Sequence, residues 1–166
     1  SDLTESELEN EIHKYKDCTV VAMSFTSPKK DEIYKIVKKI KSLYPEKYII
    51  AGGTHPTVDA QDVMQNEDID CVCVGEGEQV IADIVKNYRT QNLSSIPNIY
   101  YKQNGKFHKN ETCMDQSHSL DHYPLPDYSI FKFEDMHCYK ARIKYLPLML
   151  SRGCPYNCSY CSNYVV

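Results

Sequence analysis

This chain of 166 residues lacks the sequence features of membrane, secreted, nucleic-acid-binding and repeat proteins. No apolar run approaches the ~20 residues of a membrane-spanning helix, and no signal-peptide pattern opens the chain. The formal net charge is -4, which argues against a general binder of phosphate backbones, because such a protein needs a basic face. No internal repeat or low-complexity tract is visible. We therefore expect a cytoplasmic globular protein without a nucleic-acid partner or a membrane span.

The cysteines lack the regular spacing of a disulfide framework, although there are eight of them. Three lie between Cys154 and Cys161, and the other five are scattered. Among the scattered ones, Cys71 and Cys73 alternate with valines in an expected strand, where a free cysteine behaves as a small hydrophobe. The spacing favours a reducing cytoplasm, three ligand thiolates and five bystanders.

What is present is an alternation of strand-like and helical patterns. Apolar, β-branched runs predict strands at 18–26, 48–51 and 70–74. Helical spacing of apolar residues predicts a helix after each strand, and a capping box at Thr4 and Glu7 predicts one before the first. Such alternation indicates parallel strands joined by crossover helices. The expected fold class is α/β, a doubly wound (Rossmann-like) parallel sheet in residues 1–92 that lacks its beginning.

The pattern changes after this region. An Asn104-Gly105 pair between two short apolar runs predicts a β-hairpin extension in residues 93–120. Residues 121–143 begin with a stretch rich in proline and aromatic residues, which is typical of an extended linker. An apolar run at 145–151 then predicts the first strand of another domain, which starts at about residue 144 and is cut off at residue 166.

The strongest motif is RGCPYNCSYC at residues 152–161, a C-x3-C-x2-C arrangement of Cys154, Cys158 and Cys161. Three thiolates on one tight loop can hold three irons of a [4Fe-4S] cluster, because soft sulfur ligands suit such clusters. The fourth iron then stays open, whereas a cluster that only carries electrons normally has four cysteine ligands. Structural zinc is the alternative, but no fourth ligand lies close in the sequence.

This motif, following a short apolar strand, resembles the signature of radical S-adenosylmethionine (SAM) enzymes. The resemblance implies that Cys154, Cys158 and Cys161 hold the cluster, that SAM chelates the open iron, and that Tyr160 packs near the adenine of SAM. Reductive cleavage of SAM to a 5′-deoxyadenosyl radical implies an electron donor such as flavodoxin or ferredoxin. No pair of residues indicates general acid–base chemistry, so no catalytic residue is predicted, and we expect the fragment alone to be inactive.

Two glycine-containing loops follow predicted strands, at Gly52-Gly53-Thr54-His55 and at Gly75-Glu76-Gly77-Glu78. Doubly wound sheets bind ligands at the carboxyl ends of their strands, where glycine lets the backbone approach closely. Either loop taken alone is explained equally well as an ordinary strand-to-helix turn. Glu76 and Glu78 are explained better as glutamates at a helix start, and His55 as a loop histidine with ordinary hydrogen bonds.

Together, and upstream of the cysteine triad, the loops resemble the cobalamin-binding domain of one large radical SAM subclass. The resemblance spans roughly residues 18–90 and implies a corrinoid over the strand ends. The cofactor-binding residues that it implies are Ser24, Thr26, Gly52, Gly53, Thr54 and Gly75. The D-x-H-x-x-G motif that supplies a lower cobalt ligand in other cobalamin proteins is absent.

Proteins with this architecture include radical SAM methyltransferases and the anaerobic magnesium-protoporphyrin IX monomethyl ester oxidative cyclase. The implied reaction is therefore methyl transfer or oxidative cyclisation on an organic small-molecule substrate such as a tetrapyrrole. The alternative is a corrinoid- or metal-binding module that does not cleave SAM, with an electron-transfer cluster or structural zinc.

Overall fold

The computed structural model describes residues 4–113, 121, 123–125, 127–130, 152–154, 156 and 158–161. Its sheet has five strands whose spatial order follows the chain, β1-β2-β3-β4-β5. The strands are β1 (Val20–Ser24), β2 (Tyr48–Gly52), β3 (Cys71–Cys73), β4 (Ile99–Gln103) and β5 (Lys106–Lys109). The first three are mutually parallel, while β4 is antiparallel to both β3 and β5. The predicted α/β class is confirmed, and the hairpin continues the sheet as its antiparallel part.

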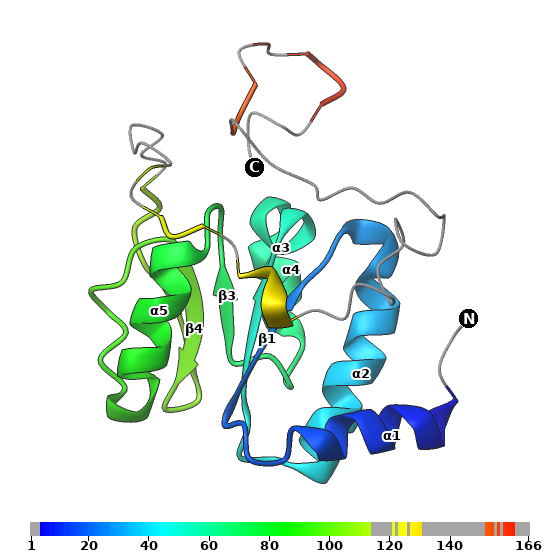
Figure 1. Cartoon of the computed structure of the whole chain (residues 1–166). Coiled ribbons are helices and arrows are strands. Elements are labelled where there is room, and N and C mark those ends of the chain that lie inside the picture. The colour runs from blue at the N-terminus through cyan, green and yellow to red at the C-terminus, as the bar shows by residue number, and fades with distance from the viewer. Residues whose placement is uncertain are drawn as a thin grey trace.

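Helices cover both faces of the sheet (Figure 1). They are α1 (Glu5–Lys14), α2 (Lys30–Leu43), α3 (Thr54–Val58), α4 (Ala60–Gln65) and α5 (Glu78–Asn87), with 3-10 turns at Ser27–Lys29, Tyr88–Thr90 and Tyr128–Ile130. Successive strand residues point to opposite faces, so Ile49 and Val72 pack with α1, α2 and α4, while Ile50 and Cys71 pack with α5. In the described ranges, none of these helices has the length and apolarity to cross a membrane.

Local chemistry sets where the elements begin. The Thr4 side chain accepts a hydrogen bond from the Glu7 N–H and the Glu7 carboxylate accepts one from the Thr4 N–H, which is the predicted capping box of α1. The helix expected near residues 59–66 is α4, whose start the Asp59 side chain caps by accepting from the Asp62 N–H. A further short helix, α3, precedes it in a stretch where the sequence predicted only a loop.

The β4–β5 turn follows the sequence signal directly. Asn104 and Gly105 have φ values of 53° and 70°, as the two central residues of a type I′ hairpin turn require. Most of the expected linker, and all of the strand expected at 145–151, lie outside the described residues.

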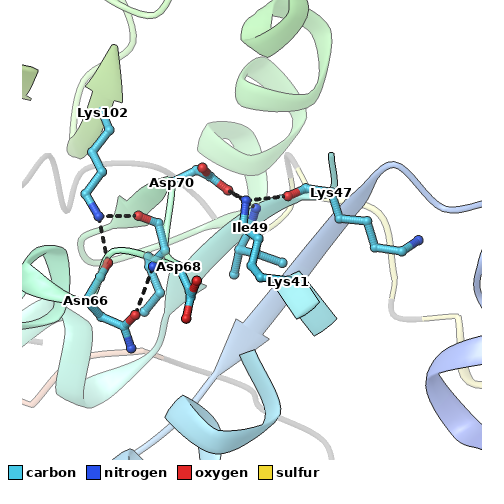
Figure 2. A network of polar contacts seen from close by, with 8 residues as sticks. Lys41, Lys47, Ile49, Asn66, Asp68, Asp70 and Lys102 are labelled. Atoms are coloured by element: carbon cyan, nitrogen blue, oxygen red, sulfur yellow. Dashed lines mark hydrogen bonds and ion pairs between the residues drawn. The ribbon is translucent and has the colours of Figure 1, made fainter. Parts of the chain in front are cut away.

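A network of hydrogen bonds and ion pairs links neighbouring strands at the amino ends of β2 and β3 (Figure 2). Asp70 Oδ2 accepts hydrogen bonds from the Ile49 N–H (2.7 Å) and from Lys41 Nζ (2.8 Å). From β4, Lys102 Nζ donates to the carbonyls of Asn66 (2.6 Å) and Ile69 (2.9 Å). These hydrogen bonds tie β2, β4 and the start of β3 together at the end of the sheet opposite the carboxyl ends of the parallel strands.

Candidate functional site

A hollow of about 800 Å³ opens at the carboxyl ends of β1, β2 and β3. Its floor consists of alternate strand residues, which therefore face the same side of the sheet as α5. These residues are Ala22 and Ser24 of β1, Ile50 and Gly52 of β2, and Cys73 of β3. Ala22 and Ser24 are exposed, since α5 packs over β3 and β4 and leaves this part of β1 open.

The wall comes from the segments that follow the strands and from a distant part of the chain. It consists of Met23, Gly53, Gly75, Glu76, Gly77, Glu78, Ile81, Arg152 and Gly153. Arg152 and Gly153 belong to the RGC sequence that leads into the cysteine triad. The hollow therefore joins the α/β domain to the segment that carries the predicted metal ligands.

Gly53 lets two strand ends approach closely at the hollow. Its φ is 90°, and a Cβ added there would lie 2.5 Å from Ser24 Oγ and 2.9 Å from the Phe25 backbone nitrogen. Both the backbone conformation and the space therefore require glycine. On the neighbouring loop, the Gly75 N–H donates to Thr57 Oγ1 (3.0 Å), which ties the β3–α5 connection to α3.

The floor is neutral and the rim is charged. Burial, followed by the nearby Glu78 charge, raises the pKa of the Cys73 thiol to about 11, so Cys73 is protonated at neutral pH. At the rim, Arg152 pairs with Glu76 (3.3 Å) and with Glu78. The hydrogen bond from Arg152 holds the pKa of the Glu78 carboxyl below its ordinary value, which keeps that carboxyl ionised.

The structure gathers four of the six residues expected to bind cobalamin, since Ser24, Gly52, Gly53 and Gly75 all line the hollow. Thr26 and Thr54 are not in its lining. Thr26 instead precedes the 3-10 turn, where its carbonyl accepts from the Lys29 N–H (2.9 Å), and Thr54 is the first residue of α3.

The lining residues that the sequence analysis did not assign to the site include Ala22, Cys73 and Arg152. Ala22 had a usable signal, because it lies two residues before the predicted site residue Ser24 on β1 and so faces the same way. Arg152 had none, because its place in the wall depends on a contact between segments far apart in the sequence. His55 does not line the hollow; it lies buried in α3 and not in a loop, and its Nδ1 lies 3.0 Å from Ser27 Oγ. Its Nε2 is buried without a hydrogen-bond partner among the described residues.

The predicted cluster ligands lie beside this site without forming a ligand set. Cys154 is exposed and Cys158 and Cys161 are half-buried, with the Cys161 N–H donating to the Cys158 carbonyl (3.0 Å). Among the residues that the structure describes, no three metal-ligating side chains are gathered. Tyr160 is 91% exposed. The three thiols suit an iron–sulfur cluster chemically, but they are not arranged around one.

Comparison with known families decides what the α/β region is. Residues 2–85 match the B12 binding domain family. The chain belongs to this B12-binding family. The match includes β1, β2 and β3 and every lining residue of the hollow except Arg152 and Gly153. The resemblance to cobalamin-binding proteins inferred from the sequence is thereby confirmed.

Three curated proteins are similar to this B12-binding chain. The uncharacterized methyltransferase PH0819 of Pyrococcus horikoshii is 31% identical over 165 residues, covering 98% of this chain and 35% of the relative. The anaerobic magnesium-protoporphyrin IX monomethyl ester cyclase of Cereibacter sphaeroides is 22% identical, covering 87% of this chain and 24% of the relative. The hopanoid C-3 methylase of Methylococcus capsulatus is 26% identical, covering 79% and 25%. The chain thus spans between 24% and 35% of the length of these relatives.

Proposed function

We propose that this chain binds cobalamin in the hollow at the strand ends and forms the cofactor-binding part of a radical SAM enzyme. The observation that carries the proposal is the hollow itself, since it lies at the carboxyl ends of the parallel strands inside the region that matches the family. The proposed reaction is methyl transfer to an organic substrate, supported by the names of two relatives, or oxidative cyclisation of a tetrapyrrole, supported by the third.

The lining fits a corrinoid in its chemistry. A corrin is a broad apolar macrocycle with polar amides around its edge, and the hollow has an apolar, neutral floor and a charged rim. Gly52 and Gly53 would let the backbone approach the ring closely. Glu76, Glu78 and Arg152 supply acceptors and donors that amides can use. When bound, cobalamin supplies a cobalt–carbon bond through which a methyl group can be transferred.

The protonated state of Cys73 suits this role. A thiolate in the floor would be a strong metal ligand, whereas a thiol is a small apolar group with a weak donor. Because burial raises the pKa of Cys73 to about 11, this residue forms part of the floor as a neutral thiol at neutral pH.

The proposal assigns the cysteine triad to a [4Fe-4S] cluster that binds and cleaves SAM, with Tyr160 near the adenine and a flavodoxin or ferredoxin as electron donor. Three thiolate donors in C-x3-C-x2-C spacing support this assignment, because they leave one iron for SAM. Arg152 and Gly153 support it further, because both line the hollow and directly precede Cys154.

The cobalamin proposal is tested by filling the hollow. Ala22 is exposed on the floor, so Ala22→Leu adds side-chain volume there without disturbing the buried core. We expect methylcobalamin to bind the unaltered chain and to bind Ala22→Leu about tenfold or more weakly, because overpacking a filled site costs ~1–3 kcal/mol. Absorbance titration in dim light measures the Kd.

The matched control is Ala82→Leu, the same substitution at an exposed position of α5 outside the hollow. Its Kd is expected to stay within about twofold of the unaltered value, since surface changes are mostly small. Failure of the unaltered chain to bind methylcobalamin would contradict the proposed function. Equal weakening by the two leucines would place the ligand somewhere other than the hollow.

A further inference from the structure

Arg152 connects two parts of the chain that lie 74 residues apart in the sequence. It stands two residues before Cys154, and its guanidinium reaches Glu76 in the β3–α5 loop and Glu78 at the start of α5. In Figure 1, the orange and red parts of the chain, which belong to this C-terminal segment, lie beyond the end of the sheet where α3 begins. The arginine that introduces the triad is therefore bound to the rim of the hollow.

The contact has more than one support. The Arg152 Nη1 atom lies 3.3 Å from a Glu76 oxygen, its Nη2 bonds to Glu78, and the guanidinium carbon lies 5.7 Å from the centre of the Tyr123 ring. About a third of the Arg152 side chain is exposed, so the pair alone is a surface pair and is worth little in water. A bulky ligand over the hollow would exclude water from this contact and strengthen it.

We propose, on the basis of the function proposed above, that Arg152 is a positioning residue that couples cobalamin in the hollow to the placement of the cysteine segment. A ligand in the hollow meets Arg152, Gly153 and the two glutamates together, since all four line the same wall. Whatever orders this wall also orders the residues leading to Cys154. By linkage, anything that fixes the cysteine segment then raises affinity for cobalamin in the same proportion.

The rate of trypsin cleavage after Arg152 measures how strongly Glu76 and Glu78 hold this residue, because trypsin must bind the arginine side chain that they pair with. The double variant Glu76→Gln, Glu78→Gln removes both carboxylates and keeps the cleavage site. Released fragment 153–166 is quantified by mass spectrometry. We expect the double variant to be cleaved about three- to tenfold faster than the unaltered chain, which corresponds to a weak pair. Methylcobalamin is expected to slow cleavage of the unaltered chain, and to slow that of the variant less.

The control is Glu32→Gln, which removes an exposed carboxylate that pairs with Lys29 on another face of the molecule. Its cleavage rate after Arg152 should equal that of the unaltered chain. A double variant cleaved no faster than this control would overturn the proposal even without added cobalamin. Thermal unfolding of each variant by circular dichroism separates a loosened segment from a destabilised fold.

A double-mutant cycle on the methylcobalamin Kd tests the coupling. Arg152→Gln and the double variant Glu76→Gln, Glu78→Gln are each expected to weaken binding about three- to tenfold, and the combination no more than either alone, because both remove the same contact. Multiplying effects would mean that the two sides of the contact act independently, which would overturn the coupling while leaving cobalamin binding intact. Absence of any binding by the unaltered chain would instead contradict the proposed function.

Discussion

At the scale of single residues, Gly53 shows how one missing side chain shapes the site. Four of the described glycines have positive φ, and two of them differ sharply in their surroundings: a Cβ at Gly53 would collide with Ser24 and Phe25, while one at Gly105 would meet nothing within 4 Å. The pair therefore separates the cost of the backbone conformation from the cost of the collision.

Gly53→Ala is expected to lower the free energy of unfolding by about 3 kcal/mol or more, since strain and collision add. Gly105→Ala should lower it by only ~1–2 kcal/mol, the cost of a left-handed conformation alone. Urea denaturation followed by circular dichroism measures both. Equal losses would mean that the β1–β2 approach at Gly53 relaxes easily, and that this glycine is needed for its backbone alone.

The Cys73 thiol gives a prediction in pH. Because burial raises its pKa to about 11, the reactive thiolate fraction increases about tenfold per pH unit between pH 7 and 9, without reaching a plateau. Iodoacetamide labelling resolved by mass spectrometry should show this slope at Cys73, and faster labelling of the exposed Cys18 and Cys113. A plateau at Cys73 below pH 9 would show that its thiolate is stabilised and available to a metal.

These residues also mark what sequence can and cannot predict. Gly53 was predictable because a glycine directly after a strand has few explanations, and Cys73 was predictable as a buried small hydrophobe. That Cys73 also lines the hollow depends on the three-dimensional position of the hollow, which the sequence does not give. Arg152 was not predictable, because its partners Glu76 and Glu78 are set by tertiary structure and have an adequate local explanation as helix-start residues.

At the scale of elements, Lys47 joins the first helix to the sheet. Its side chain is 2% exposed, and Nζ donates to the carbonyls of Tyr15 (2.9 Å), Lys16 (3.0 Å) and Cys18. These carbonyls follow α1, where the end of a helix leaves carbonyls without intrahelical partners, and the Tyr15 carbonyl also accepts from the Cys18 N–H (3.0 Å). A lysine before a strand reads as an ordinary polar residue in the sequence, so its burial could not be foreseen.

Lys47→Met keeps the length of the side chain and removes its three donors. We expect the free energy of unfolding to fall by about 2–3 kcal/mol, because three carbonyls lose one charged donor that is itself buried. Lys38→Met, at an exposed position of α2, is the control and should change it by less than about 0.5 kcal/mol. Chemical denaturation distinguishes the two, and a similarly small change in both would show that water replaces the lysine.

The pattern of elements was otherwise largely predictable, because apolar period and turn chemistry act locally. Asn104-Gly105 fixed the hairpin, and the capping box fixed the start of α1. The pairing of β4 with β3 was not predictable, since any antiparallel partner would satisfy the same alternation. The short helix α3 was missed, because its five residues are too few to show a helical period.

At the scale of the whole molecule, the hollow and the triad are neighbours with different requirements. The hollow exists in the folded chain, since the strand ends and the Gly53 and Gly75 turns hold it open. The triad is recognisable from sequence alone, yet its thiols are not gathered among the described residues. Metal-binding loops commonly acquire their ligand geometry together with the metal.

The two sites should therefore be separable by substitution. After anaerobic reconstitution with ferrous iron and sulfide, we expect the chain to hold ~4 irons, the content of one cluster. Cys158→Ala should lose most of this iron and keep its methylcobalamin Kd within about twofold, because Cys158 is not in the lining of the hollow. Ala22→Leu should show the reverse, weak cobalamin binding with full iron content.

Elemental analysis and absorbance titration of both variants decide the matter. Zinc retained in place of iron, or iron unchanged in Cys158→Ala, would contradict the cluster and leave a cobalamin-binding domain beside a structural metal or none.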